Sequence, residues 1–270
     1  MIPFDVPAVE EGITGTEFAG QIAHFVSVSS TNTLALEVAQ TGARRGVYVA
    51  DEQTAGRGRG GHSWHSMAGD GLYFSALVAP PIPSTMAMLL PLATGLAAQS
   101  AIAVVTGLAA DIRWPNDLLL HGRKCGGILV ESASTAGQDA NGSLLRYAVI
   151  GVGINVNHQS FPVEIAALAT SLRNECGHPV SREALLVAIL RSLDREIRLV
   201  VEEYRGELRG AGLLERFTAA STWVWGKRVH VEEEGGYTGV TDGLDARGFL
   251  RVAGDDGVMH TVISGGVRER

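Results

Sequence analysis

Residues 55–64 combine glycine, arginine and tryptophan in a spacing that suits an anionic ligand. The stretch reads Ala-Gly-Arg-Gly-Arg-Gly-Gly-His-Ser-Trp. Its glycines allow the backbone to approach a ligand closely and to adopt a positive φ. Arg57 and Arg59 supply permanently charged, planar donors for carboxylate or phosphate oxygens. Trp64 offers a ring that stacks on a nucleobase, so the segment predicts a loop for an anionic ligand with a flat ring.

Other nucleotide-binding and nucleic-acid-binding patterns fit this loop less well. Gly/Arg-rich segments are often disordered RNA-binding tails, but this one is short and lies between two apolar, strand-like segments. A P-loop would need Gly-x-x-x-x-Gly-Lys-Ser/Thr, which is absent here. Residues 56–61 match Gly-x-Gly-x-x-Gly formally, yet two arginines within the match and no clear helix after it argue against a dinucleotide fold.

Two further segments place polar groups at turns or beside glycines. Asn116 and Asp117, in the sequence Trp-Pro-Asn-Asp, offer an amide and a carboxylate, although Pro-Asn-Asp is also ordinary turn chemistry. Lys124 comes just before Gly126 and Gly127, which lack side chains that would cover its ammonium group. Contact with a ligand and exposure at a hairpin are the two interpretations of this lysine.

A run of hydroxyl and amide side chains at residues 29–32, Ser-Ser-Thr-Asn, precedes apolar residues at helical spacing. These residue types cap helix N-termini, so a capped helix accounts for them without any ligand. The same position presents free N–H groups to polar ligand atoms. Both interpretations stay open at this point.

The elements that must position these groups alternate between strands and helices. The predicted elements are strands at 46–50, 71–78 and 147–156 and an amphipathic helix at 184–204 capped by Ser181. The first two strands flank the glycine-rich loop. Within the third, Gly151, Gly153 and Asn155 share one face, and the two glycines leave room there for a ligand or another backbone.

The uncharged residues 87–105 approach the ~20 residues of a membrane span. Because Pro91, Gly95 and Gln99 lie among them, we predict a buried helix of an α/β or α+β domain instead. After about Thr222 the sequence changes to short alternating strands at hairpin spacing, which predicts a small all-β barrel.

Composition excludes several broad classes. A net charge of −7 gives no general basic surface for nucleic acid. Two cysteines make no disulfide framework, and a reducing cytosol is the simplest setting. The histidines are scattered without paired Cys/His spacing, so no structural metal is expected. The first twelve residues contain no basic region of the kind that begins a signal peptide.

In this order, the motifs resemble those of the biotin protein ligase family over nearly the entire chain. The matching segments are 30–32, 53–59, Trp64, 114–117, Lys124 with 127–131, 151–155 and 170–172. The resemblance implies an α+β catalytic domain at 1–220, with a mixed sheet and packed helices as in class II synthetases. It implies a small all-β SH3-like barrel at 221–270. We expect the monofunctional type, because about 29 residues before Ser30 leave no room for the winged-helix DNA-binding domain of some members.

The activity that the resemblance implies is a two-step acyl transfer in the cytoplasm. Biotin and ATP, with Mg²⁺, form biotinyl-5′-AMP and pyrophosphate, and a lysine of a biotin carboxyl carrier domain then attacks the mixed anhydride. No DNA or membrane partner is expected. The family includes monomers and dimers, so a homodimer stays open.

The resemblance also assigns roles to single positions. Ser30, Thr31, Asn32 and Gln53 match residues around the biotin head group; Gly56, Arg57, Gly58 and Arg59 match the closing loop; Trp64 and Asn116 match the adenine and phosphate side; Gly127, Gly151 and Asn155 match further pocket positions. The catalytic candidates are Lys124, Arg57, Arg59 and Asp117. Fixed cations would stabilise the charge that builds on the phosphate during adenylation. Either Asp117 or Lys124 would orient the incoming amine.

One departure and two rival functions follow from the same comparison. Residues 60–62 read Gly-Gly-His, where the family loop usually carries more basic residues. A lipoate- or octanoate-transferring relative would share the catalytic fold but lack the Gly-Arg-Gly-Arg loop and the barrel. A non-catalytic biotin-binding protein would not need Lys124 or the Trp-Pro-Asn-Asp segment.

Overall fold

A seven-stranded sheet and a five-stranded sheet organise the chain in a computed structural model that describes residues 3–135, 143–233, 235–263 and 266–270. The large sheet comprises β1 Ile22–Val28, β2 Gly46–Gln53, β3 Gly71–Val78, β4 Asp111–Arg113, β5 Asp117–Leu120, β6 Arg123–Ser134 and β7 Leu145–Asn155, in the order β1-β2-β3-β7-β6-β5-β4. β1 pairs with β2 in parallel, and the later pairs are antiparallel. The sheet is therefore mixed, as expected.

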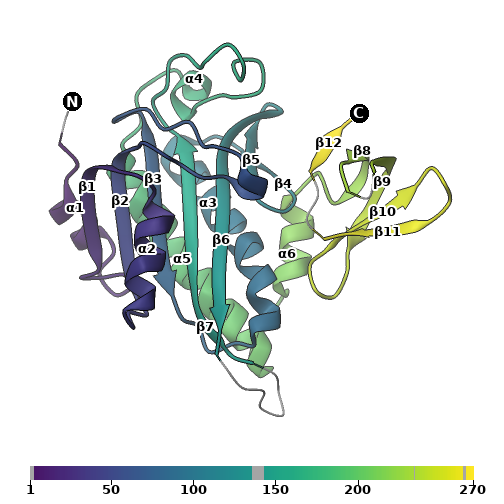
Figure 1. Cartoon of the computed structure of the whole chain (residues 1–270), viewed down its shortest axis with the longest axis horizontal. Helices are drawn as coiled ribbons and strands as arrows, with labels where there is room; N and C mark the ends of the chain where they lie inside the picture. The colour runs from purple at the N-terminus through teal and green to yellow at the C-terminus, as the bar shows by residue number, and fades with distance from the viewer. Residues whose placement is uncertain (1–2, 136–142, 234, 264–265) are drawn as a thin grey trace.

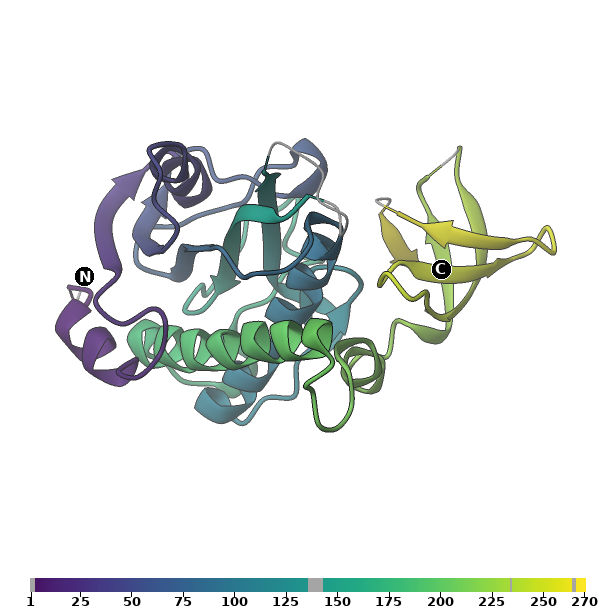
Figure 2. The same ribbon diagram turned by 90° about the horizontal axis from the view of Figure 1, so that it is seen from below.

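Helices cover both faces of the large sheet (Figure 1, Figure 2). α2 Thr31–Gln40 lies on one face against β2, β3 and β7, whereas α3 Leu89–Thr106 and α5 Arg182–Arg205 pack together on the other face. The remaining helical segments are α1 Val6–Gly12, η1 Arg59–Gly61, η2 Ser84–Met88, α4 Leu172–Cys176 and α6 Leu213–Ala220. The core lies between the sheet and the α3–α5 layer, while α2 leaves part of its own face open.

The helix predicted near residues 184–204 forms because its apolar residues recur every three or four positions. α5 buries Leu185, Leu186 and Ile189 on one side. The Ser181 hydroxyl accepts a hydrogen bond from the backbone N–H of Ala184 at 3.1 Å, which confirms the predicted cap. The helix ends at Gly206, whose φ of 70° is the left-handed conformation that glycine tolerates best.

The uncharged segment forms α3, a helix of the protein core. Among the described residues, the stretch from Ser84 to Thr106 is long and apolar enough to cross a membrane by length and composition alone. Leu90, Ala93 and Ala97 are nonetheless completely buried within the fold. A Cβ on Gly95 would lie 3.3 Å from the Ile112 side chain, so the helix packs closely on β4. The prediction of a buried helix is confirmed.

The small sheet follows α6 and is antiparallel throughout its described strands. These are β8 Trp225–Val231, β9 Tyr237–Leu244, β10 Leu250–Gly254, β11 Met259–Val262 and β12 Val267–Glu269, in the order β11-β10-β9-β8-β12. The all-β module predicted after Thr222 is thus confirmed, although the sequence pattern missed β12, as it missed α1 and β1. Trp114 joins the two sheets, because its Nε1 donates a hydrogen bond to the Gly248 carbonyl at 2.9 Å.

Candidate active site

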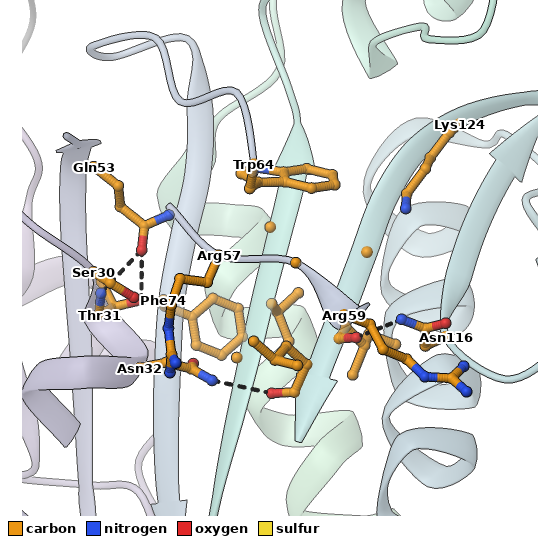
Figure 3. Close-up of a pocket in the computed structure, with 17 residues that line it drawn as sticks. Ser30, Thr31, Asn32, Gln53, Arg57, Arg59, Trp64, Phe74, Asn116 and Lys124 are labelled. Carbon is orange, nitrogen blue, oxygen red and sulfur yellow. Dashed lines mark hydrogen bonds between the residues drawn. The ribbon is translucent and has the colours of Figure 1, made fainter. Parts of the chain in front are cut away.

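A pocket opens on the face of the large sheet that α2 leaves uncovered (Figure 3). It contains about 450 Å³ of space, part of it open to solvent. The predicted site residues that line it are Ser30, Thr31, Asn32, Gln53, Arg57, Gly58, Arg59, Trp64, Asn116, Lys124, Gly127 and Gly151. Residues from five separate parts of the chain are therefore brought together at one site.

The floor of the pocket is a part of the sheet that carries few side chains. Gly127 of β6 pairs with Gly153 of β7, and Leu129 pairs with Gly151. A Cβ on Gly153 would lie 2.7 Å from the Trp64 indole, and a Cβ on Gly151 would lie 2.1 Å from Asn32 Oδ1. These glycines allow Trp64 and Asn32 to lie directly on the sheet, as the shared face of Gly151 and Gly153 predicted.

Gln53, at the end of β2, caps the start of α2. Its Oε1 accepts hydrogen bonds from the backbone N–H of Thr31 at 2.9 Å and from the Thr31 hydroxyl at 3.1 Å. Its Nε2 donates to the Ser66 hydroxyl at 3.2 Å. Ser30 occupies the N-cap position, but its side chain makes no capping hydrogen bond. A purely capping role for Ser30 is therefore wrong, and this residue lines the pocket instead.

Ser75 of β3 fixes the orientation of Asn32. Its hydroxyl is fully buried, donates to Asn32 Oδ1 at 2.5 Å and lies 2.8 Å from the Thr31 hydroxyl. The Asn32 amide nitrogen then donates to the Leu129 carbonyl at 3.3 Å and to Glu131 Oε2 at 3.0 Å. Thr31, Asn32 and Gln53 form the polar wall of the pocket, which thus presents hydroxyl and amide groups in fixed positions. The sequence motifs did not predict Ser75, although it is the one aliphatic hydroxyl residue in the sequence Leu-Tyr-Phe-Ser-Ala-Leu.

The opposite wall carries positive charge around one buried carboxylate. Asp117 Oδ1 lies 2.5 Å from Lys124 Nζ, and Oδ2 lies 2.5 Å from the Arg113 guanidinium. Burial raises the pKa of Asp117, but the charges of Lys124 and Arg113 and their hydrogen bonds outweigh it and hold the pKa below its ordinary value. Asp117 is therefore an anion that fixes the Lys124 ammonium, which lies 5.5 Å from the centre of the Trp64 ring.

The glycine-rich segment folds into a short hairpin above the pocket. Gly58 N–H donates to the His62 carbonyl at 2.6 Å, and Trp64 N–H donates to the Gly56 carbonyl at 2.9 Å. Gly60 and Gly61, with φ of 66° and 81°, make its tight end. A ligand loop between two strands is what the sequence predicted, and β2 and β3 are those strands.

The two loop arginines reach different parts of the site. Arg57 forms an ion pair with Glu131 beside Asn32 (Figure 3). The Arg59 guanidinium lies 5.9 Å from the centre of the Trp114 ring. Burial lowers the pKa of Arg59, while Asp117 opposes this effect. This guanidinium still carries its charge at neutral pH, because arginine is effectively always protonated in proteins.

Three predicted residues do not line the pocket. Gly56 lies under the Trp64 backbone, where a Cβ would come within 2.8 Å of the Trp64 carbonyl oxygen. Asp117 acts on the pocket through Lys124, as described above. Asn155 is buried and donates to the Thr170 carbonyl at 3.0 Å. Because Thr170 N–H donates to the Lys124 carbonyl at 2.9 Å, Asn155 supports the segment that holds Lys124.

Comparison with known proteins identifies the family that shares this arrangement. Residues 24–155 match the model described as "Biotin/lipoate A/B protein ligase family", and residues 224–267 match "Biotin protein ligase C terminal domain". A Mycobacterium tuberculosis protein named "Biotin--[acetyl-CoA-carboxylase] ligase" is 32% identical over 256 residues, which span 91% of this chain and 87% of the relative. The chain belongs to the biotin protein ligase family. The C-terminal match also separates it from the lipoate-transferring alternative, which was expected to lack that domain.

Other members of the biotin protein ligase family support the same assignment. "Bifunctional ligase/repressor BirA" of Bacillus subtilis is 36% identical over 236 residues, which span 82% of this chain and 70% of that protein. The structure described as biotin protein ligase from Aquifex aeolicus in complex with biotin and ATP is 26% identical, with a TM-score of 0.74 over 93% of this chain and 100% of that chain. The family resemblance predicted from the motifs is confirmed.

Proposed function

We propose that this protein activates biotin with ATP to biotinyl-5′-AMP and transfers the biotinyl group to a lysine of a biotin carboxyl carrier domain. The observation that carries the proposal is one pocket with a neutral polar wall and a cationic wall on opposite sides. A neutral ureido ring needs hydroxyl and amide partners, which Thr31, Asn32 and Gln53 offer. A carboxylate and a phosphate need cations, which Arg57, Arg59 and Lys124 supply.

The first step brings two anions together. The biotin carboxylate oxygen attacks the α-phosphorus of ATP, an O–P bond forms, and pyrophosphate leaves with the electrons of the broken bond. Lys124, held by Asp117 at 2.5 Å, is already in place when negative charge builds on the α-phosphate. Trp64 presents its ring to the adenine, and Asn116, whose Nδ2 donates to the Ile128 carbonyl at 2.8 Å, borders the phosphate side.

In the second step the carrier lysine amine attacks the acyl carbon, and AMP leaves. An acyl adenylate hydrolyses readily, so exclusion of water is a requirement of the site. The hairpin at 55–64 lies above the pocket, where it shields the intermediate. In this proposal Lys124, which Asp117 holds in place, borders the approach of the amine, and the amine proton passes to the phosphate of the departing AMP.

Magnesium enters this proposal as part of the ATP substrate. Among the described residues, no cluster of three or more His, Cys, Asp or Glu side chains is placed to hold a metal ion. Asp117, the carboxylate beside the cationic wall, is already paired with Lys124 and Arg113. The fit is therefore to a Mg²⁺ carried by the nucleotide phosphates, which is the usual mode for this ion.

The remaining assignments belong to the same proposal. We assign catalysis to a domain at 1–220 and a supporting role to a domain at 221–270, which contacts the first domain through the Trp114–Gly248 hydrogen bond. The carrier domain is the macromolecular partner and the cytoplasm is the location.

One reaction mixture tests the proposed function. The purified chain is incubated with radiolabelled biotin, MgATP and a biotin carboxyl carrier domain, with a carrier whose acceptor lysine is replaced by arginine as control. We expect biotin-dependent release of pyrophosphate and labelling of the intact carrier alone. Biotin binding without pyrophosphate release would show a non-catalytic biotin-binding protein and refute the proposal.

A further inference from the structure

Glu131 lies on β6 just beyond Leu129, the last residue of this strand that lines the pocket, and the proposed reaction gives this carboxylate no role. Along β6, Gly127, Leu129 and Glu131 point to the same face, because side chains alternate along a strand. Gly127 lies under Trp64, and Glu131, four residues further along the strand, is opposite Val149 of β7. Its side chain is 29% exposed. A half-buried carboxylate thus stands at the biotin end of the site.

One oxygen of Glu131 joins the loop to the polar wall. Glu131 Oε2 pairs with the Arg57 guanidinium and accepts a hydrogen bond from Asn32 Nδ2 at 3.0 Å. Arg57 belongs to the hairpin, Glu131 to the floor and Asn32 to α2. The Arg57 side chain therefore extends from the hairpin to the edge of the polar wall (Figure 3).

The same contacts continue along the wall to the other end of the loop. Asn32 accepts from Ser75, which touches Thr31, and Thr31 contacts Gln53. Gln53 Nε2 donates at 3.2 Å to Ser66, two residues beyond the hairpin. The loop is thus tied to the wall at Arg57 and at Ser66. Of the two ties, only the one at Arg57 is an ion pair.

We propose that Glu131 is a positioning residue that holds Arg57 across the pocket and so keeps the loop closed on the activated intermediate. This inference rests on the proposed function. The biotin carboxylate loses its charge when it becomes a mixed anhydride, so an arginine held by that carboxylate alone would lose its partner at the moment when closure matters. Glu131 keeps its charge through both steps, and its hold on Arg57 does not depend on the chemical state of the ligand.

Glu131→Gln tests this role with little change in shape. The amide oxygen still accepts from Asn32, but the charge that holds Arg57 is gone. Without a carrier, we expect biotin- and ATP-dependent AMP release to rise about three- to tenfold, the range for one partly exposed, charge-assisted contact. Single-turnover pyrophosphate release and biotin affinity should stay within about twofold. Glu37→Gln, at an exposed site on α2, is the matched control.

A double-mutant cycle shows whether Glu131 acts through Arg57. The variants are loaded with preformed biotinyl-5′-AMP, so that adenylation does not limit the readout, and AMP release without a carrier is measured. Arg57→Gln alone should release AMP at least as fast as Glu131→Gln, and the double variant should release it no faster than Arg57→Gln. Should Glu131→Gln fail to fold, Arg57→Gln still tests the Arg57–Glu131 ion pair, because the Arg57 side chain is 43% exposed and its replacement should not disturb the fold. If the two substitutions increase AMP release additively in the double variant, the inference is overturned.

Three further outcomes are decisive. If Glu131→Gln releases AMP without a carrier at the wild-type rate, the ion pair does not hold the loop. If that variant binds biotin more tightly and releases AMP more slowly, Glu131 competes with the ligand for Arg57. This result too would overturn the proposal. If the wild-type protein itself releases no pyrophosphate with biotin and ATP, the proposed function fails instead.

Discussion

Replacement of Lys124 tests the centre of the proposed mechanism. Its ammonium borders the pocket and is held 2.5 Å from Asp117 Oδ1. Lys124→Ala removes one preorganised donor from the place where charge builds on the α-phosphate. Loss of such a donor costs about 2.7–4 kcal/mol of transition-state stabilisation, a factor of about 10²–10³ in rate. Asp117 keeps Arg113 as a partner, so the fold and the biotin-binding wall should survive.

Lys124→Arg separates the charge from the shape of the side chain. The chain contains only two lysines, Lys124 and Lys227, against twenty arginines. A Cβ on Gly127 would lie 3.3 Å from Lys124 Cε, so there is little space for a planar guanidinium. The guanidinium introduced at position 124 would also compete with Arg113 for Asp117. We expect Lys124→Arg to lose about tenfold or more in adenylation, although its charge is kept.

The assay for both variants is biotin-dependent exchange of labelled pyrophosphate into ATP, with biotin affinity measured by calorimetry. Lys227→Ala is the control, because Lys227 pairs with Glu269 in the small sheet at 2.8 Å and does not line the pocket. We expect near-normal biotin affinity in all three variants and a large loss of exchange in the two Lys124 variants alone. Near-wild-type exchange by Lys124→Ala would refute the role given to this lysine.

Three other substitutions test separate parts of the site. In Gly153→Ala the new methyl group would lie 2.7 Å from the Trp64 indole, so we expect the KM for ATP to rise about tenfold or more while biotin affinity changes little. Ser75→Ala frees the Asn32 amide, and calorimetry should show biotin affinity lowered about tenfold, the cost of a polar group left without its partner. Asp117→Asn tests pH dependence. Because the folded-state pKa of Asp117 is below its unfolded value of 3.8, its stabilising effect is full above that value and is lost as pH falls towards the folded pKa. The Tm of the wild type should therefore fall more steeply below about pH 4 than that of Asp117→Asn.

Local patterns predicted most of the elements that build the pocket. Alternation predicted β2, β3 and β7, and the three- to four-residue spacing of apolar positions predicted α5. These patterns are reliable because each element buries one face, and burial fixes which positions are apolar. β1 was missed because it is an edge strand and none of its residues is fully buried, so its sequence carries a weak pattern. β12 has only three residues and gives no pattern at all.

The site itself was predicted as a set of residues but not as a set of contacts. The motifs brought the loop, Asn116 and Lys124 into one hypothesis, and the structure places them around one pocket. Ser75 and Glu131 were not assigned, because each acts through a partner far away in the sequence. Ser75 contacts Asn32 across 43 positions, and Glu131 contacts Arg57 across 74. Pairings of this kind follow from strand order and register, which short motifs do not reveal.

The location of the pocket follows from where the sheet lacks side chains. Gly127, Gly151 and Gly153 make an area of bare backbone on β6 and β7, bordered by Leu129 and Glu131. A sheet face without side chains would normally weaken packing. Here Trp64 covers one end of it and Asn32 the other, and both come close enough for a methyl group to displace them. The space between them remains for a ligand. Substitution of any of these glycines should therefore alter ligand binding before it alters the fold, because the side chain that would have to move belongs to the site.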